Sequence, residues 1–162
     1  MRRRHHLTVV LVLGLTLAGC ANAGPAEGTV RVVGVVDGDT FRAIVGGREE
    51  RIRLIGVDTP EVASYGGRGE CFGSEAGAFA KERLEGHSVR LIYDRERRDR
   101  YDRLLAYVYI EGELFNLTLL REGYATALEV PPNTTMAAAF DRAEEDARAA
   151  GIGLWAACPS PG

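Results

Sequence analysis

Two aspartates at the ends of β-branched runs are the first candidates for chemistry. Asp39 belongs to the segment "DGDT", in which Asp37 is interpreted as a turn former, and Asp58 belongs to "VDTPE". If the two strand ends meet, the carboxylates of Asp39 and Asp58 repel each other unless a cation lies between them. Oxygen ligands favour a hard cation such as Ca²⁺ or Mg²⁺. The segments therefore suggest a metal site, although both aspartates also suit the ordinary role of turn formers.

Two arginines and one glutamate provide groups for phosphate chemistry. Arg53 lies inside the apolar run 51–57, and Arg103 closes the segment 95–103, which contains five arginines. A guanidinium fork matches two phosphate oxygens, so the two arginines suit a phosphate clamp. The alternative is that Arg53 faces solvent and that 95–103 is a loop whose charges compensate each other. Glu61 is either a surface residue or a base for an attacking water.

If these groups converge, they form a site that can hydrolyse a phosphodiester. A cation and two guanidinium groups would stabilise the negative charge that develops on the phosphate, and a carboxylate would accept a proton from the water. Such a site needs neither a histidine nor a covalent intermediate with the protein.

The elements that must position these residues are predicted from hydrophobic periodicity and turn residues. Three β-branched runs joined by "DG" and "GG" turns indicate a meander, and two more runs follow a helix. A stripe from Met136 through Phe140 and Ala143 to Ala147 and Ala150 predicts a long last helix. The predicted strands are 29–36, 41–45, 51–57, 87–94 and 104–110, and the predicted helices are about 74–84, 114–123 and 134–150. This order predicts an α+β, mainly β domain: a five-stranded OB-fold barrel with three α-helices.

The N-terminus has the order of a secretory signal, with arginines, an apolar run and small residues before Cys20. The segment "LAGC" resembles a bacterial lipobox, which implies removal of residues 1–19 and lipidation of Cys20; the alternative is an ordinary cleaved signal. Acyl chains would anchor the protein to a membrane without spanning it. Residues 20–28 would be a flexible tether, 29–158 the domain and 159–162 a C-terminal tail. We therefore expect an exported lipoprotein on the extracytoplasmic face of a bacterial cell envelope.

The charge of the mature chain limits how it can meet an anionic substrate. Loss of the three N-terminal arginines leaves 17 basic and 23 acidic residues, a net charge of −6. Proteins that bind nucleic acid through a broad basic face have the opposite sign. An anionic substrate must therefore meet a local cluster of arginines or a metal ion.

Two cysteines remain after Cys20, namely Cys71 and Cys158. An even pair in an exported domain favours a disulfide over free thiols or a catalytic cysteine. The chain-entropy model gives such a long loop a stabilisation of roughly 4 kcal/mol.

Four segments together resemble the staphylococcal nuclease (thermonuclease) family in content, order and spacing: "VDGDT", "RLIGVDTPE", "RDRYDRLLAY" and the terminal "GLW". The similarity extends from about Val30 to Trp155. It implies an OB barrel and a Ca²⁺-dependent phosphodiesterase, an endonuclease that cleaves DNA and RNA and leaves 3′-phosphate ends. We further expect a monomer that prefers single-stranded or frayed regions of its substrate.

The resemblance also implies roles for individual residues. Ca²⁺ would be bound by the carboxylates of Asp39 and Asp58 and by the backbone carbonyl of Thr59. Glu61 matches the general base, and Arg53 and Arg103 match the arginines that contact the scissile phosphate. A pair that helps to hold a terminal phosphate is matched by Arg100 and Tyr101.

The sequence departs from the family pattern at two places near the expected site. Leu128 and Val130, with Glu129 between them, stand where the family archetype has tyrosines that bind nucleotide. Asp102 stands where a glycine is usual, and we expect it to neutralise Arg103 in part. A non-catalytic OB-fold module that binds nucleic acid is the alternative function, and a surface protein with a purely structural Ca²⁺ and disulfide is a third interpretation.

Overall fold

The computed structural model describes residues 28–63 and 69–158. The predicted signal peptide (1–19), the lipidation site Cys20 and the tail 159–162 lie outside the described residues, as does the tether apart from Gly28. Among the helices of the described ranges, none has both the length and the apolar character that crossing a membrane requires.

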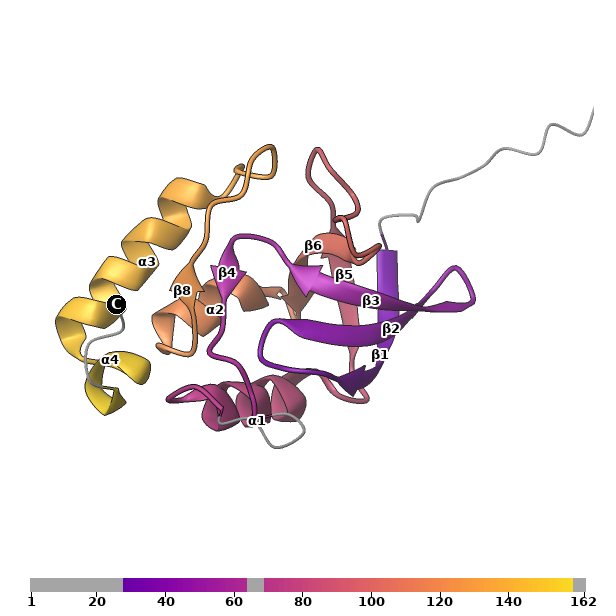
Figure 1. Cartoon of the computed structure of the whole chain (residues 1–162). Helices are drawn as coiled ribbons and strands as arrows, with labels where there is room; N and C mark the ends of the chain where they lie inside the picture. The colour runs from indigo at the N-terminus through magenta and orange to yellow at the C-terminus, as the bar shows by residue number, and fades with distance from the viewer. Residues whose placement is uncertain (1–27, 64–68, 159–162) are drawn as a thin grey trace, which may run out of the picture.

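The described residues form eight strands and four helices (Figure 1). The strands are β1 (Gly28–Val35), β2 (Thr40–Val45), β3 (Arg48–Leu54), β4 (Val57–Asp58), β5 (Ser88–Ile92), β6 (Leu104–Ile110), β7 (Glu113–Leu114) and β8 (Thr126–Ala127). The helices are α1 (Gly73–Leu84), α2 (Phe115–Arg121), α3 (Ala137–Ala150) and α4 (Leu154–Ala157).

The five long strands close into a barrel. Neighbouring strands follow the order β3-β2-β1-β5-β6, and a parallel pairing of β3 with β6 joins the two ends. The short strand β7 pairs antiparallel with the end of β6, while β4 and β8 form a separate two-stranded sheet beside the barrel. The predicted five-stranded OB-fold barrel is confirmed, and the four-residue helix α4 adds a fourth helix to the three predicted ones.

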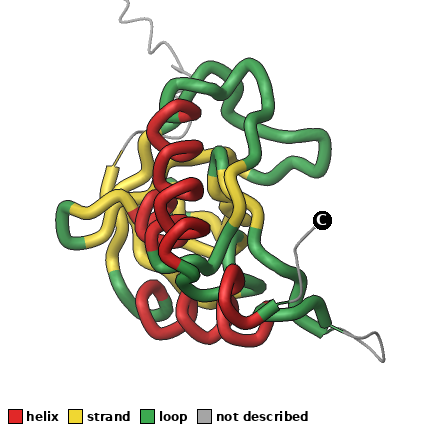
Figure 2. Tube along the Cα trace, turned by 90° about the vertical axis from the view of Figure 1, so that its left-hand side faces the viewer, coloured by secondary structure: helices red, strands yellow, loops and turns green. Residues whose placement is uncertain are grey.

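Strand alternation explains which residues fill the barrel. In β2, Phe41, Ala43 and Val45 are buried, whereas Arg42 and Ile44 between them are exposed, as period-two alternation requires. Helices α2 and α3 lie on one side of the barrel and α1 lies beneath it in the view of Figure 1, and Figure 2 shows the helices in front of the barrel strands. The core therefore joins strand residues to helix residues such as Phe115 and Phe140, which are almost fully buried.

The predicted continuous strand 51–57 is wrong, because the chain breaks at Ile55 and Gly56. Gly56 has φ +77°, in the left-handed region that favours glycine. A Cβ at this position would lie 2.5 Å from a ring carbon of Phe140 on α3. Asn116 of α2 holds the break in place, because its Nδ2 donates to the Ile55 carbonyl at 2.8 Å and its Oδ1 accepts from the Val108 N–H at 2.9 Å. The break ends β3 and starts β4, which pairs with β8 instead of continuing along the barrel.

Helix α3 starts later than the sequence predicts, at Ala137 rather than at residue 134 or 135. Thr135 is engaged by another part of the chain, since its N–H and its hydroxyl both donate to the Asp94 carboxylate. The predicted apolar stripe is buried at Phe140, Ala143 and Ala147, whereas Ala150 at its end is exposed.

Candidate active site

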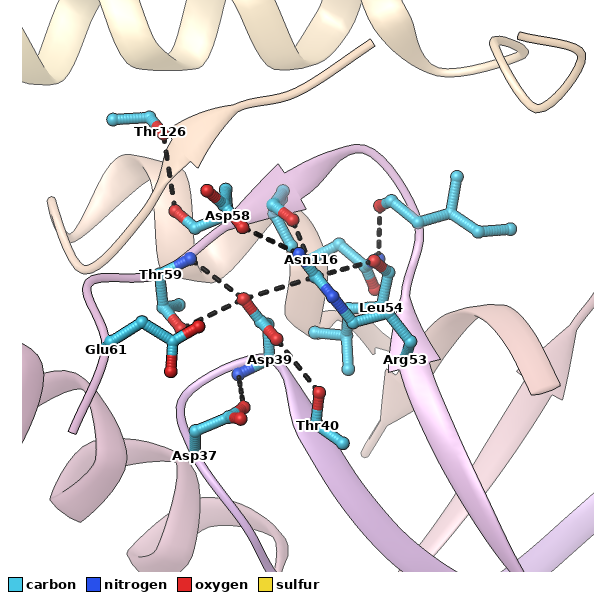
Figure 3. Close-up of polar contacts among 12 residues, drawn as sticks. Asp37, Asp39, Thr40, Arg53, Leu54, Asp58, Thr59, Glu61, Asn116 and Thr126 are labelled. Carbon is cyan, nitrogen blue, oxygen red and sulfur yellow. Dashed lines mark hydrogen bonds and ion pairs between the residues drawn. The ribbon is translucent and has the colours of Figure 1, made fainter. Parts of the chain in front are cut away.

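Asp39 is the buried carboxylate at the centre of the site. It precedes β2 and is only 5% exposed. Its Oδ2 accepts hydrogen bonds from the Thr59 N–H at 2.9 Å and the Thr59 hydroxyl at 3.0 Å, and its Oδ1 accepts from the Thr40 hydroxyl at 3.0 Å (Figure 3). The turn at Gly38 lies so close to Thr59 that a Cβ there would be 2.7 Å from the threonine hydroxyl. The turn before β2 and the segment after β4 are therefore packed together, as the sequence analysis required.

Arg53 connects this carboxylate with the second one. Its Nη1 lies 3.2 Å from Oδ2 of Asp39, and its Nη2 donates to Oδ1 of Asp58 at 2.7 Å. Nη1 also donates to the carbonyls of Leu54 at 3.1 Å and Val57 at 2.8 Å. These two carbonyls lie on either side of the strand break. The bend at Gly56 thus brings Asp58 back to the arginine that precedes it by five residues (Figure 3).

Negative charge is concentrated here. Burial, followed by the charge of Asp39, raises the pKa of Asp37 to about 6, and the Asp37 Oδ1 accepts a hydrogen bond from the Asp39 N–H at 3.1 Å. Burial also raises the pKa of Asp58; Arg53 opposes this effect, whereas the charges of Asp39 and Glu70 add to it. The site therefore offers a cation two carboxylates whose mutual repulsion it would relieve.

The donor set is small for a metal site. Across residues 28–63 and 69–158, no group of three or more His, Cys, Asp or Glu side chains is arranged to hold a metal ion. Asp39 and Asp58 are the two carboxylates that face a common cation, the Arg53 guanidinium. All-oxygen donors suit a hard cation, which accepts backbone carbonyls and waters as its remaining ligands. The carboxylates of Asp39 and Asp58 are thus chemically suited to a hard cation such as Ca²⁺ rather than to zinc.

Glu61 follows Thr59 at the edge of this cluster. Its side chain is exposed, and Figure 3 shows its carboxylate on the same side of the chain as Asp39 and Thr59. Its backbone is fixed by Glu70: the Glu61 N–H donates to Glu70 Oε2 at 2.9 Å, and the Glu70 N–H donates to the Glu61 carbonyl at 2.9 Å. A Cβ at Gly73 would clash with that same Glu61 carbonyl. An otherwise exposed carboxylate is therefore held on a well-packed backbone.

Arg53 also lines a cleft of about 560 Å³ beside the carboxylates. Its lining also includes Arg100, Tyr101 and Arg103 of the loop 95–103. The Arg100 Nη2 donates to the Tyr101 hydroxyl at 2.6 Å, and the guanidinium groups of Arg100 and Arg103 lie 4.7 and 5.5 Å from the Tyr101 ring centroid. The structure thus brings three of the arginines singled out from the sequence to one cleft.

Asp99, not Asp102, neutralises Arg103. The Arg103 Nε lies 2.7 Å from Oδ2 of Asp99. Burial alone would raise the pKa of Asp99, but hydrogen bonds from Arg103 and from the Tyr101 N–H outweigh this effect and lower it. Asp102 instead pairs with Arg98 at 3.3 Å, and its side chain is 87% exposed. The expectation that Asp102 would neutralise Arg103 is therefore wrong. The backbone of Asp102 has φ 63°, a left-handed conformation that glycine adopts without strain.

The arginine-bearing loop 95–103 is tied to the rest of the fold by residues that the sequence analysis did not single out. Arg98 forms two hydrogen bonds with the Glu50 carboxylate of β3, at 2.9 and 3.0 Å. The Asn133 side chain accepts from the Glu96 N–H and donates to the Glu96 carbonyl, both at 2.8 Å. Asp94 accepts from the Tyr107 hydroxyl at 2.9 Å as well as from Thr135. The loop is therefore fixed both to the barrel and to the segment before α3.

That segment supplies an apolar edge to the cleft. Leu128 and Val130 both line it, and they are 40% and 56% exposed. The structure thus places Leu128 and Val130, which the resemblance sets at the positions of tyrosines, against the same cleft as Arg53 and Arg103. They offer apolar contact there but no ring and no hydroxyl.

The predicted disulfide is confirmed. Cys71 and Cys158 are bonded, with their Cα atoms 5.9 Å apart. The bond joins the residue after Glu70 to the end of α4. It therefore fixes the segment that holds the backbone of Glu61.

Comparison with known proteins supports the resemblance. Residues 51–157 match the model of the family described as Staphylococcal nuclease homologue. The chain is 41% identical over 121 residues to a thermonuclease of Staphylococcus intermedius, covering 75% of this chain and 72% of the relative. It is 38% identical over 138 residues to a thermonuclease of Staphylococcus hyicus, covering 85% and 80%. It is 36% identical over 122 residues to endonuclease YncB of Bacillus subtilis (strain 168), covering 74% and 58%.

Proposed function

The chain belongs to the staphylococcal nuclease family, and we propose that it is a nuclease that hydrolyses phosphodiester bonds of DNA and RNA in a Ca²⁺-dependent reaction. One observation carries this proposal. The Arg53 guanidinium contacts the carboxylates of Asp39 and Asp58 and also lines the cleft that contains Arg103. The proposed cation site and the proposed phosphate-binding surface therefore share one residue.

The proposed division of labour follows from the chemistry of each group. Asp39, Asp58 and the Thr59 carbonyl would hold Ca²⁺, which when bound supplies positive charge next to the phosphate. Arg53 and Arg103 donate to the phosphate oxygens and stabilise the negative charge that develops during attack. Glu61 accepts a proton from the attacking water. Arg100 and Tyr101 bind a terminal phosphate at the far side of the cleft.

We further propose that cleavage leaves 3′-phosphate ends and that the enzyme is a monomer that prefers single-stranded or frayed regions. The cleft supports the preference for single strands, because its volume of about 560 Å³ and its apolar edge suit an unpaired nucleotide better than a stacked duplex. The reaction products test the proposal that cleavage leaves 3′-phosphate ends. Their 3′ ends should resist extension by a polymerase until a phosphatase has treated them, and immediate extension would contradict it.

The proposed location is the extracytoplasmic face of the envelope, with lipid on Cys20. The sequence motif at residues 17–20 and the disulfide support it, because disulfides persist in oxidising compartments. Cells that express the full chain should contain it in the detergent phase of a Triton X-114 extract, and Cys20→Ser should move it to the aqueous phase. An unchanged distribution would contradict lipidation.

Plasmid degradation by purified protein tests the activity itself. Degradation should require Ca²⁺ and stop when EDTA is added in excess. Degradation that EDTA does not affect would overturn the metal dependence. Binding of DNA without cleavage at any Ca²⁺ concentration would instead support a non-catalytic OB-fold module.

A further inference from the structure

The outer surface of the barrel carries a row of arginines that begins next to the site. Arg51 and Arg53 are two residues apart on β3, so their side chains leave the same face of the strand. Arg51 lies directly opposite Arg42 of β2. The Arg42 guanidinium reaches across to β1, because a Cβ at Gly34 would lie 2.5 Å from its Nη2. The first two positions of the row thus lead from Arg53 towards β1.

The row continues over β1 and β5. Ile44, two residues after Arg42, lies opposite Arg31 of β1. Thr29, two residues before Arg31, lies opposite Arg90 of β5. Because alternation keeps such residues on one face, the four strands present their arginines on the same outer surface, with neighbouring positions about 5–7 Å apart along or across the strands. We call Arg51, Arg42, Arg31 and Arg90 the arginine row.

This surface is exposed and lies away from α3 and α4. All four arginines are exposed, and β1, β2 and β3 lie on the side of the molecule opposite α3 and α4 in Figure 1. The exposed apolar residues Val33 and Ile44 lie among them. The Arg90 guanidinium lies 4.6 Å from the ring centroid of Tyr109, which orients it by a cation–π contact.

The charge of the row is scarcely compensated. Two acidic residues occur in β1, β2, β3 and β5, namely Glu49 and Glu50. Glu50 pairs with Arg98, and Glu49 pairs with Arg42 at 3.1 Å while both remain about half exposed. Arg31, Arg51 and Arg90 form no ion pair with any residue of the described ranges. An acidic protein thus keeps three exposed arginines without an ion-pair partner in the described ranges on this outer surface, on the strand of Arg53 and on β1 and β5.

We propose that the arginine row binds the phosphates of a polynucleotide strand beyond the bond that is cleaved. This inference rests on the proposed function, because the strand on the arginine row is the part of the same substrate that extends beyond the cleft. Continuity with Arg53 favours a nucleic-acid strand over other anions, because a strand held at Arg53 must leave the cleft past a neighbouring surface. The row therefore makes long polynucleotides, rather than short oligonucleotides, the preferred substrate class.

Substrate length and salt dependence test the row. The variant Arg31→Gln, Arg42→Gln, Arg51→Gln, Arg90→Gln is compared with wild type and with a charge-matched control whose four glutamines replace helix arginines: Arg83, Arg121, Arg142 and Arg148. Each protein cleaves a long single-stranded DNA and a dinucleotide across a range of salt concentrations. Melting temperatures verify that all three proteins are folded.

For the row variant we expect kcat/KM on long DNA to fall by about tenfold or more and its salt dependence to flatten, because each lost phosphate contact removes about 0.7 from the logarithmic slope. Cleavage of the dinucleotide should not change. The control should keep the wild-type slope. If none of the three proteins cleaved either substrate, the proposed function itself would fail.

Three results would contradict the proposed role of the arginine row while leaving the proposed nuclease function intact. The row variant could keep the wild-type slope on long DNA, lose activity equally on both substrates, or behave like the helix control. Binding to vesicles that contain anionic phospholipid is measured in parallel. A variant that loses vesicle binding but keeps its activity on long DNA would assign the row to the membrane surface instead.

Discussion

Arg53 donates to Asp58 at 2.7 Å across the break that separates β3 from β4. The two residues are five positions apart, and a regular strand would hold their side chains far from each other. In the free protein, a side-chain cation thus balances the carboxylates that we propose as Ca²⁺ ligands. Arg53 must redistribute its hydrogen bonds when it meets a phosphate.

This relationship predicts opposite effects of Arg53 on catalysis and on cation binding. Arg53→Gln should lower kcat by about 10²-fold or more, because a donor to the developing charge is lost. Calorimetric titration with Ca²⁺ should show binding no weaker than in wild type, because the variant removes a positive charge beside the two carboxylates. Asp58→Asn is the matched variant and should weaken binding. Equal weakening by both changes would contradict this role of Arg53.

The contact between Asp99 and Arg103 predicts a contrast between two aspartates of one loop. Asp99→Ala should lower activity by about tenfold or more, because Arg103 loses the carboxylate that orients it and small misplacements are costly. Asp102→Gly should stay within about twofold of wild type, since an exposed ion pair contributes little and glycine suits the positive φ. Cleavage rates of single-stranded DNA check both. A larger loss of activity in Asp102→Gly than in Asp99→Ala would show that Asp102, not Asp99, balances the charge of Arg103.

Glu70 should act on catalysis chiefly by positioning Glu61, whose backbone it holds with two hydrogen bonds. Glu70→Ala should lower kcat by about tenfold because the base is less well positioned, while Glu70→Gln, which keeps an acceptor for the Glu61 N–H, should be close to wild type. In a Glu61→Gln background, Glu70→Ala should have no further effect. Glu75→Ala, an exposed carboxylate on α1, is the control. Additive losses in the double variant would show an independent role for Glu70.

Asp94 should make stability depend on pH in the acid range. Burial alone would raise its pKa, but hydrogen bonds from Thr135, Tyr107 and Arg95 outweigh burial and lower it below the unfolded value of about 3.9. The stabilisation is therefore fully present above the unfolded pKa and is lost as pH falls through the lower folded pKa.

Urea denaturation of Asp94→Ala measures this contribution. At neutral pH the variant should lose roughly 1.5–3 kcal/mol of unfolding free energy, the range for hydrogen bonds to a charged group. The difference from wild type should narrow below about pH 4. Asp146→Ala, an exposed site on α3, should show a small difference throughout. A deficit at Asp94→Ala that is independent of pH would show that the carboxylate charge is not its source.

Local patterns were sufficient to predict the barrel and to single out residues that meet at the candidate site. Alternation in β2, the turn residues and the even cysteine pair depend on neighbours or on simple pairing, and the structure has all of these features. Asp39, Arg53 and Asp58 were recognisable because charged residues are unusual at the ends of apolar runs. Their convergence follows from two adjacent strand ends.

The rest depends on contacts between distant segments. The positive φ of Gly56 is linked to the Phe140 ring on α3, so the strand break has no purely local signal. Glu70 meets Glu61 only after the chain returns to it, and Asn133 meets Glu96 across 37 residues. The single amide in the apolar segment of α2, Asn116, was a visible hint, because a buried amide needs partners. Its partners could not be named without the fold.

Replacement of the proposed general base tests the central claim most directly. The kcat of Glu61→Gln on single-stranded DNA at saturating Ca²⁺ should be about 10²–10⁴-fold below wild type, the range for loss of a positioned base. Its melting temperature and Ca²⁺ affinity should equal those of wild type, because the Glu61 side chain is exposed and is not a proposed ligand. A folded variant with near-wild-type kcat would contradict the mechanism.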